Sequence, residues 1–81
     1  SATSVEDLEL DKVRLTVKDG KLNLFNLPQN STIRVMDLGG RQLASKTNAS
    51  GNETLQIPTK GVALVQIGYG HATRVEKVMV R

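Results

Sequence analysis

Apolar residues alternate with polar ones in short runs from residue 12 onward, and turn-forming residues separate these runs. The first run places Val13, Leu15 and Val17 between charged or hydroxyl side chains. A period of two residues is the pattern of a strand with one buried face, whereas a surface helix repeats every three to four residues. Asp19-Gly20 follows this run and precedes a second one, which is the strongest short signal for a two-residue β-hairpin. The alternation therefore predicts that the fold begins with two antiparallel strands.

The pattern continues along the chain and predicts an all-β fold without helices. We expect about seven short strands, which cover residues 12–18, 22–24, 33–37, the neighbourhood of 43, and residues 55–57, 62–67 and 73–81. The segment 62–65 is apolar at every position, so it predicts a strand that is covered on both sides or placed centrally in a sheet, and that is the best-buried strand of the fold. A change of parity between Val75 and Val78 predicts a bulge in the last strand. Short strands at this spacing indicate a seven-stranded antiparallel β-sandwich of immunoglobulin-like architecture.

The length of 81 residues leaves room for a single domain, and its composition limits how that domain is stabilised. The chain has no cysteine and only two aromatic residues, so we expect an aliphatic core without disulfides or cysteine-bound zinc. Residues 1–11 contain four acidic side chains, no basic one and no hydrophobic period. They are predicted to form a flexible acidic linker, and residues 12–81 the folded domain.

The basic residues are spread along the chain and never form a run, although the net charge is +3. Dispersed bases on a strand-rich chain are typical of a solvated face, so no nucleic-acid partner is expected. No apolar stretch approaches the roughly 18 residues that a transmembrane helix requires, so membrane insertion is not expected either.

Residues suited to catalysis are few. His71 is the only histidine and lies between two small residues in a predicted hairpin loop, where a solvated side chain is favoured over a base or a metal ligand. The serines lack the Gly-x-Ser-x-Gly context of a nucleophile, and the carboxylates fall in turns or on strand surfaces. We therefore expect a protein that is not an enzyme and that has no metal site and no cofactor.

Three Asn-x-Ser/Thr sequons begin at Asn30, Asn48 and Asn52, each in a segment expected to be a loop. Asparagine, serine and threonine are also the residues from which turns are built, and that interpretation is favoured over glycosylation.

Three short motifs occur in an unusual order. Asp37-Leu38-Gly39-Gly40-Arg41 follows a hydrophobic run, Lys60-Gly61 precedes another, and Lys77-Val78-Met79-Val80-Arg81 closes the sequence. Each has an ordinary explanation, namely glycines for turns and an amphipathic last strand. Together, over residues 12–81, they resemble the C-terminal sorting domain of cargo proteins of the type IX secretion system of Bacteroidetes.

This resemblance implies a sorting signal that directs an attached N-terminal cargo protein through an outer-membrane translocon, from the periplasm to the cell surface. A sortase-like peptidase would cut in the linker at Ser1, Ala2, Thr3 or Ser4. The residues that match the family's motifs, and through which the resemblance implies translocon recognition, are Asp37, Gly40, Arg41, Lys60, Gly61, Lys77, Val78, Val80 and Arg81.

A second interpretation belongs to another class of protein, a passive immunoglobulin-like accessory or adhesion domain whose loops bind a partner. A sorting domain must lie at the C-terminus of its parent protein, whereas an accessory domain need not. In either case an exposed edge strand would permit a weak homodimer.

Overall fold

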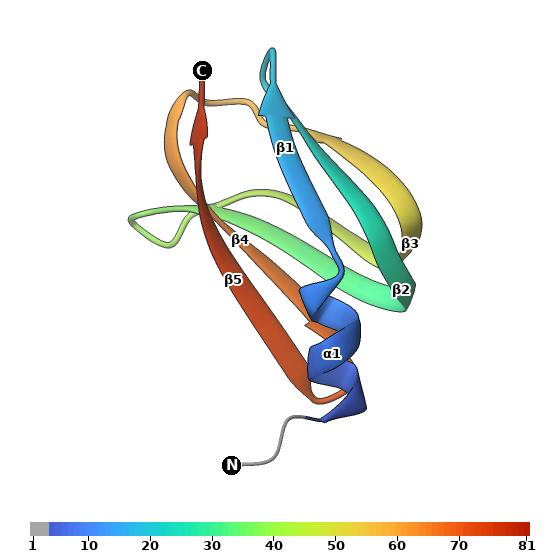
Figure 1. Cartoon of the computed structure of the whole chain (residues 1–81). Helices are drawn as coiled ribbons and strands as arrows, with labels where there is room; N and C mark the ends of the chain where they lie inside the picture. Colours follow the sequence, from blue (N-terminus) through green and yellow to red (C-terminus); the bar gives the residue numbers. More distant parts are fainter. Residues whose placement is uncertain (1–3) are drawn as a thin grey trace.

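A computed structural model describes residues 4–81, which form a predominantly antiparallel β fold with one short helix (Figure 1). The expectation of a chain dominated by antiparallel strands is confirmed. The strands number five rather than seven among the described residues, and they belong to one sheet. The elements are α1 (Val5–Asp11), β1 (Arg14–Lys18), β2 (Lys21–Asp37), β3 (Gln42–Gln56), β4 (Gly61–Tyr69) and β5 (Ala72–Val80).

The strand count was wrong because β2 and β3 each join two predicted strands. The intervening segments, 27–31 and 48–52, stay within the strands as bends instead of leaving them as loops. Asn30 and Asn48 lie at these bends with φ of 64° and 55°, a left-handed conformation that asparagine tolerates better than most residues. Pairing of β2 with β3 shifts register four times along its length. Bulges of this kind bend a strand without ending it.

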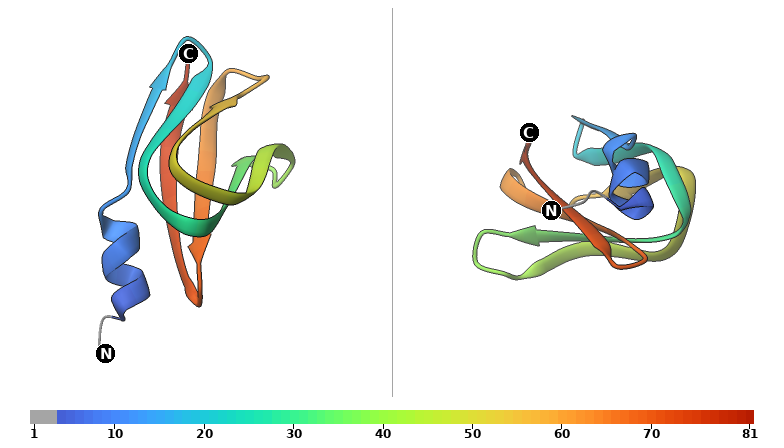
Figure 2. Two further views of the ribbon diagram at one scale, coloured as in Figure 1. Left: turned by 90° about the vertical axis from the view of Figure 1, so that its right-hand side faces the viewer. Right: turned by 60° about the horizontal axis from the view of Figure 1, so that its bottom comes forward.

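The bend in β2 determines the shape of the sheet. The first half of β2 pairs with β1 and its second half pairs with β4, while β3 follows the other side of β2 throughout. β5 pairs only with β4. Because β2 and β3 curve together, the sheet curls and its two ends come round towards each other (Figure 2). One strongly bent sheet thus encloses a core.

The aliphatic core fills the concave face of this sheet. β4 lies between β2 and β5, as expected for a central strand, but only one of its faces is buried. Val65 and Ile67 are fully buried, whereas Leu64 on the convex face is half-buried. The buried apolar residues are Leu10, Val13, Leu22, Leu24, Leu27, Ile33, Val35, Ala49, Leu55, Ile57, Ala63, Val65, Ile67, Ala72 and Val80.

The two hairpins differ in how well the sequence predicted them. The turn at Asp19-Gly20 is confirmed, with β1 and β2 pairing up to Lys18 and Lys21 on either side of it. In the β4–β5 hairpin, the predicted bulge between Val75 and Val78 is absent, because the register runs without a shift from Gly61↔Val80 to Tyr69↔Ala72. The change of parity arises because Val75 lies on the convex face, 56% exposed, whereas Val78 faces the core.

Residues 4–11 were expected to be flexible, and this expectation was wrong. The Ser4 hydroxyl accepts a hydrogen bond from the Asp7 backbone N–H at 3.1 Å, and the Asp7 carboxylate accepts one from the Ser4 N–H at 3.2 Å. This capping box satisfies two amide groups at the start of α1. Leu10, 2% exposed, joins the core from the last turn. The folded unit therefore begins before residue 12, and no helix of residues 4–81 is long and apolar enough to cross a membrane.

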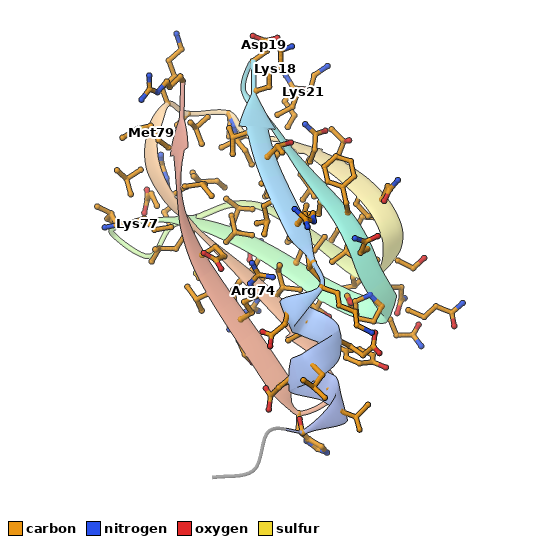
Figure 3. All side chains as sticks on the ribbon, viewed as in Figure 1. Lys18, Asp19, Lys21, Arg74, Lys77 and Met79 are labelled. Carbon is orange, nitrogen blue, oxygen red and sulfur yellow. The ribbon has the colours of Figure 1, made fainter. Side chains whose placement is uncertain are left out.

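Arg74 in β5 fixes α1 against the sheet. Its Nη1 donates hydrogen bonds to the carbonyl oxygens of Leu10 and Val13, at 2.8 and 2.7 Å, and its Nε donates to Glu76 Oε1 at 2.9 Å. Figure 3 shows Arg74 beside the end of the helix. At the other end of α1, a Glu6 carboxylate oxygen accepts the His71 N–H at 3.1 Å. Both ends of the helix are thus attached to β5 or to its preceding turn.

Candidate functional site

The first motif, Asp37 to Arg41, forms the tight turn between β2 and β3. The Asp37 N–H donates to the Arg41 carbonyl oxygen at 2.9 Å, and the Gly40 N–H donates to the Asp37 carbonyl oxygen at 3.0 Å. Asp37 Oδ1 accepts the Arg41 N–H at 2.9 Å, and Oδ2 lies 3.4 Å from Arg41 Nε. Asp37 is therefore occupied in holding the turn, which leaves Leu38 and Arg41 exposed on its outside.

The second motif, Lys60-Gly61, lies where the chain enters β4. Gly61 has a φ of +113°, which residues with a side chain rarely adopt, and no atom lies near the place of a Cβ. The glycine is thus required by backbone conformation rather than by a close neighbour. Lys60 is exposed and forms no ion pair within the described chain.

The third motif is the end of β5, whose side chains alternate between the two faces. Val80 is 2% exposed and Val78 is half-buried, so both belong to the core. Lys77 lies exposed on the convex face, and Arg81 just beyond the strand is exposed as well. Figure 3 shows the Lys77 side chain directed away from the body of the molecule, on the side opposite α1. Lys77 and Arg81 are the members of this motif whose side chains a partner could contact.

The sheet register brings the three motifs to one end of the molecule. Asp37 pairs with Ala63, and Ala63 pairs with Val78, so the turn and the last strand lie on either side of β4. Gly61 pairs with Val80. Residues that are more than 40 positions apart along the chain (37 and 80) therefore share one corner of the sheet. This juxtaposition is the candidate site.

The convex face beside this corner carries several exposed or half-buried apolar side chains. We define it by the outward residues of the second half of β2 and of β4 and β5. Val75 and Met79 are 56% and 49% exposed, and Met36, Val62 and Leu64 are half-buried around them. A shallow pocket of about 190 Å³ lies on the same face, lined by Thr32, Arg34, Gln66 and Gly68. The members of the convex face are Thr32, Arg34, Met36, Val62, Leu64, Gln66, Gly68, Thr73, Val75, Lys77 and Met79.

The remaining candidates lie apart from the corner. His71 is exposed in the β4–β5 turn, and residues 4–81 contain no group of three metal-binding side chains. The sequon residues Asn30, Asn48 and Asn52 lie in strands, not in the loops that we expected. Of the predicted cleavage linker, Ser4 caps α1, and Ser1, Ala2 and Thr3 lie outside the described residues.

One carboxylate has a clearly shifted acidity, and it lies in the bent strand β3. The side-chain hydrogen bond from Lys46, 2.7 Å from Glu53 Oε1, holds the pKa of Glu53 below its ordinary value. The backbone N–H of Ser50 lowers this pKa further by donating to the same carboxylate. The pair stabilises the bend of β3 and is not part of the candidate site.

The importance of Arg74 was not expected from the sequence, in which it is one of the dispersed basic residues. The signal that could have identified it is the alternation of core-facing and outward-facing positions along the last strand. In the last strand Ala72, Val78 and Val80 face the core, and Arg74 shares their face. A guanidinium on the core-facing side of a strand needs hydrogen-bond acceptors. Here the acceptors are the carbonyl oxygen of Leu10, in a helix that was not expected, and that of Val13, just beyond this helix.

Comparison of the chain with models of known protein families and with curated proteins found no match.

Proposed function

We propose that this domain is a non-catalytic sorting module of the type IX kind, which directs an attached N-terminal cargo protein across the outer membrane to the cell surface. The observation that carries the proposal is the corner where the three motifs meet. Antiparallel pairing brings the end of β2, the start of β4 and the end of β5 to one end of the sheet, and a recognition signal can use this arrangement to present its parts together. The corner also presents Lys60, Lys77 and Arg81 without ion-pair partners in the described chain.

β5 is suited to recognition by strand addition. It has a hydrogen-bonded neighbour only on the β4 side. α1 and β1 approach it from the other side without pairing with it, so the backbone groups of that edge are not used in the sheet. We propose that the translocon receives β5 by this edge, in the periplasm, and that the exposed cations orient the encounter. Folding is then a precondition for sorting, because Val80 holds the strand to the core.

The linker preceding the domain is proposed as the substrate of the sortase-like peptidase. Because α1 begins at Val5 with Ser4 as its cap, the cut falls before the helix and leaves the folded unit intact. The two halves of the curled sheet face each other across the core (Figure 2), and we propose this arrangement as the counterpart of the immunoglobulin-like sandwich that the resemblance implies.

A fusion experiment tests the proposal. The chain is attached to a neutral periplasmic reporter in a host that has a type IX system, and the double variant Lys77→Glu/Arg81→Glu is compared with the parent. We expect the variant to keep the reporter in the periplasm while its thermal midpoint is unchanged, because both residues are exposed. Deletion of residues 77–81 is a poorer test, since it also removes the buried Val80.

The matched control reverses the charge of two exposed cations before and at the start of β1, Lys12→Glu/Arg14→Glu. Lys18 and Lys21 are unsuitable as controls, because the tip of the β1–β2 hairpin lies at the same end of the molecule as the C-terminus (Figures 1 and 3). Equal secretion of the corner variant and the parent contradicts the proposal. So does equal loss of secretion in the corner and control variants, since this would reduce the effect to net charge.

The convex face favours a second candidate, an accessory domain that binds a partner protein. Exposed Val75 and Met79 on a small domain are typical of a contact surface. Such a domain would carry no export signal, so its fusion would leave the reporter in the periplasm even without substitutions.

A further inference from the structure

The edge of β5 is bordered by an exposed stripe in which apolar and basic side chains alternate. Val75, Lys77 and Met79 occupy successive outward positions, and Val75 and Met79 are about half exposed. Natural edge strands carry charged residues that prevent pairing with arbitrary strands. A single lysine between two exposed apolar residues repels a strand that would bring a basic residue beside it, and attracts one that would bring an acidic residue.

Lys77 is surrounded by apolar neighbours on its own face. Leu64 of β4 lies directly opposite it, and Leu64 in turn pairs with Met36 of β2. Met79 pairs with Val62 in the next row. The ammonium group of Lys77 therefore stands at the border of an apolar surface that extends over three strands.

The convex face contains two cations and no carboxylate. Its charged members are Arg34 and Lys77, and neither forms an ion pair within the described chain. The chain's acidic segment is in α1, beside the first half of β5 (Figure 1). A second copy that added its own β5 would bring a further lysine to this face, so like charges disfavour self-pairing.

We infer that the free edge of β5 and the adjoining convex face bind an extended segment of a partner protein in which an acidic residue stands between two apolar ones at alternate positions. Backbone hydrogen bonds to β5 would hold this segment as a further strand. Its outward side chains would then lie beside Val75, Lys77 and Met79, with the carboxylate next to the ammonium group. The inference rests on the proposed recognition role of β5 and names the chemistry of its partner.

A peptide titration of the purified chain tests the inference without any secretion. The probe is a synthetic nine-residue peptide in which valine, glutamate and valine occupy alternate positions separated by threonines. The control probe has lysine in place of glutamate. We expect the acidic peptide to shift the backbone amide resonances of residues 75–80 and to bind about five-fold more tightly than the basic one.

Lys77→Glu should abolish or reverse this preference, and Arg14→Glu should leave it unchanged, because Arg14 is exposed at the start of β1, at the opposite end from the C-terminus of β5. Equal binding of both peptides by the parent chain, binding of neither, or shifts confined to β1 would overturn the inference. The secretion test remains separable. Loss of secretion in the corner variant without acidic selectivity in the titration refutes this partner chemistry alone. Acidic selectivity combined with normal secretion refutes the sorting function alone.

Discussion

The β4–β5 hairpin and the β2–β3 pair differ in the regularity of their pairing. β4 and β5 keep one register over the whole of both strands, whereas β2 and β3 shift register four times. The irregular pair bends, so that the sheet encloses a core (Figure 2). The regular hairpin packs against this core and ends the sheet at β5, which pairs only with β4. Irregular pairing thus creates the shape here, and regular pairing presents the surface through which we propose that the domain acts.

The largest expected effect tests whether β4 packs against the core through only one of its two faces. Ile67→Ala removes a fully buried side chain that pairs with Ile33, and it should lower the free energy of unfolding by about 2–5 kcal/mol. Leu64→Ala on the convex face of the same strand should cost only about 1 kcal/mol. Urea denaturation measures both. Equal losses would mean that β4 is buried on both faces in solution.

Arg74 is the next test, since it joins the hairpin to α1. Arg74→Leu leaves the carbonyl oxygens of Leu10 and Val13 without this donor, and the expected loss is about 2 kcal/mol, typical of hydrogen bonds from a charged group. The substitution should accelerate amide hydrogen exchange in α1 more than in β4. Arg14→Leu, which removes an exposed cation of β1, serves as the control; unchanged protection of α1 in the Arg74 variant would contradict this role.

The bends of the irregular pair should respond to backbone conformation. Asn30→Ala places a residue that avoids positive φ at a position with φ of 64°, so we expect a loss of about 1 kcal/mol. Asn30→Gly should cost less than Asn30→Ala. Thr73→Ala in the regular hairpin is the comparison, with an expected change within about 0.5 kcal/mol. Thermal unfolding of the three variants suffices, and a greater loss for glycine than for alanine would refute the explanation.

The smallest expected effect depends on pH. Because the pKa of Glu53 is lower in the folded chain than its ordinary value, the unfolded chain binds its proton first as the pH falls. The stability from its contacts is complete above the ordinary glutamate pKa of 4.5 and is lost as the pH falls through the lower folded value. Glu53→Gln should therefore weaken the acid dependence of the unfolding midpoint. An identical dependence in both proteins would exclude the contribution.

Local pattern was enough to predict the hairpin at Asp19-Gly20, the alternation of β1 and the central place of β4. It failed where tertiary packing decides between two outcomes. The segment around Pro28 has the composition of a loop, but buried Leu27 and Ser31 keep it within β2. α1 was missed because seven residues are too few to show a helical period, although Ser4 and Asp7 held the capping signal.

The candidate site was predictable as a set of motifs but not as a place. Nothing in the sequence shows that Asp37 and Val78 flank the same residue of β4, because this register depends on the bend of β2. The sequence also did not show that Val80 is in the core while Lys77 is outside it, since Val75 obscured the parity of the strand.

The attachment of α1 by Arg74 has a consequence for the order in which the chain folds. The bonds from Arg74 to Leu10 and Val13 connect positions that are 64 and 61 residues apart. Closing so long a loop is entropically unfavourable until the intervening strands have assembled. α1 is synthesised before the five strands, yet the carbonyl groups at and just beyond its end are the last to find their partners. A chain whose β5 is incomplete therefore keeps an unsecured N-terminal segment, even where its earlier strands have formed.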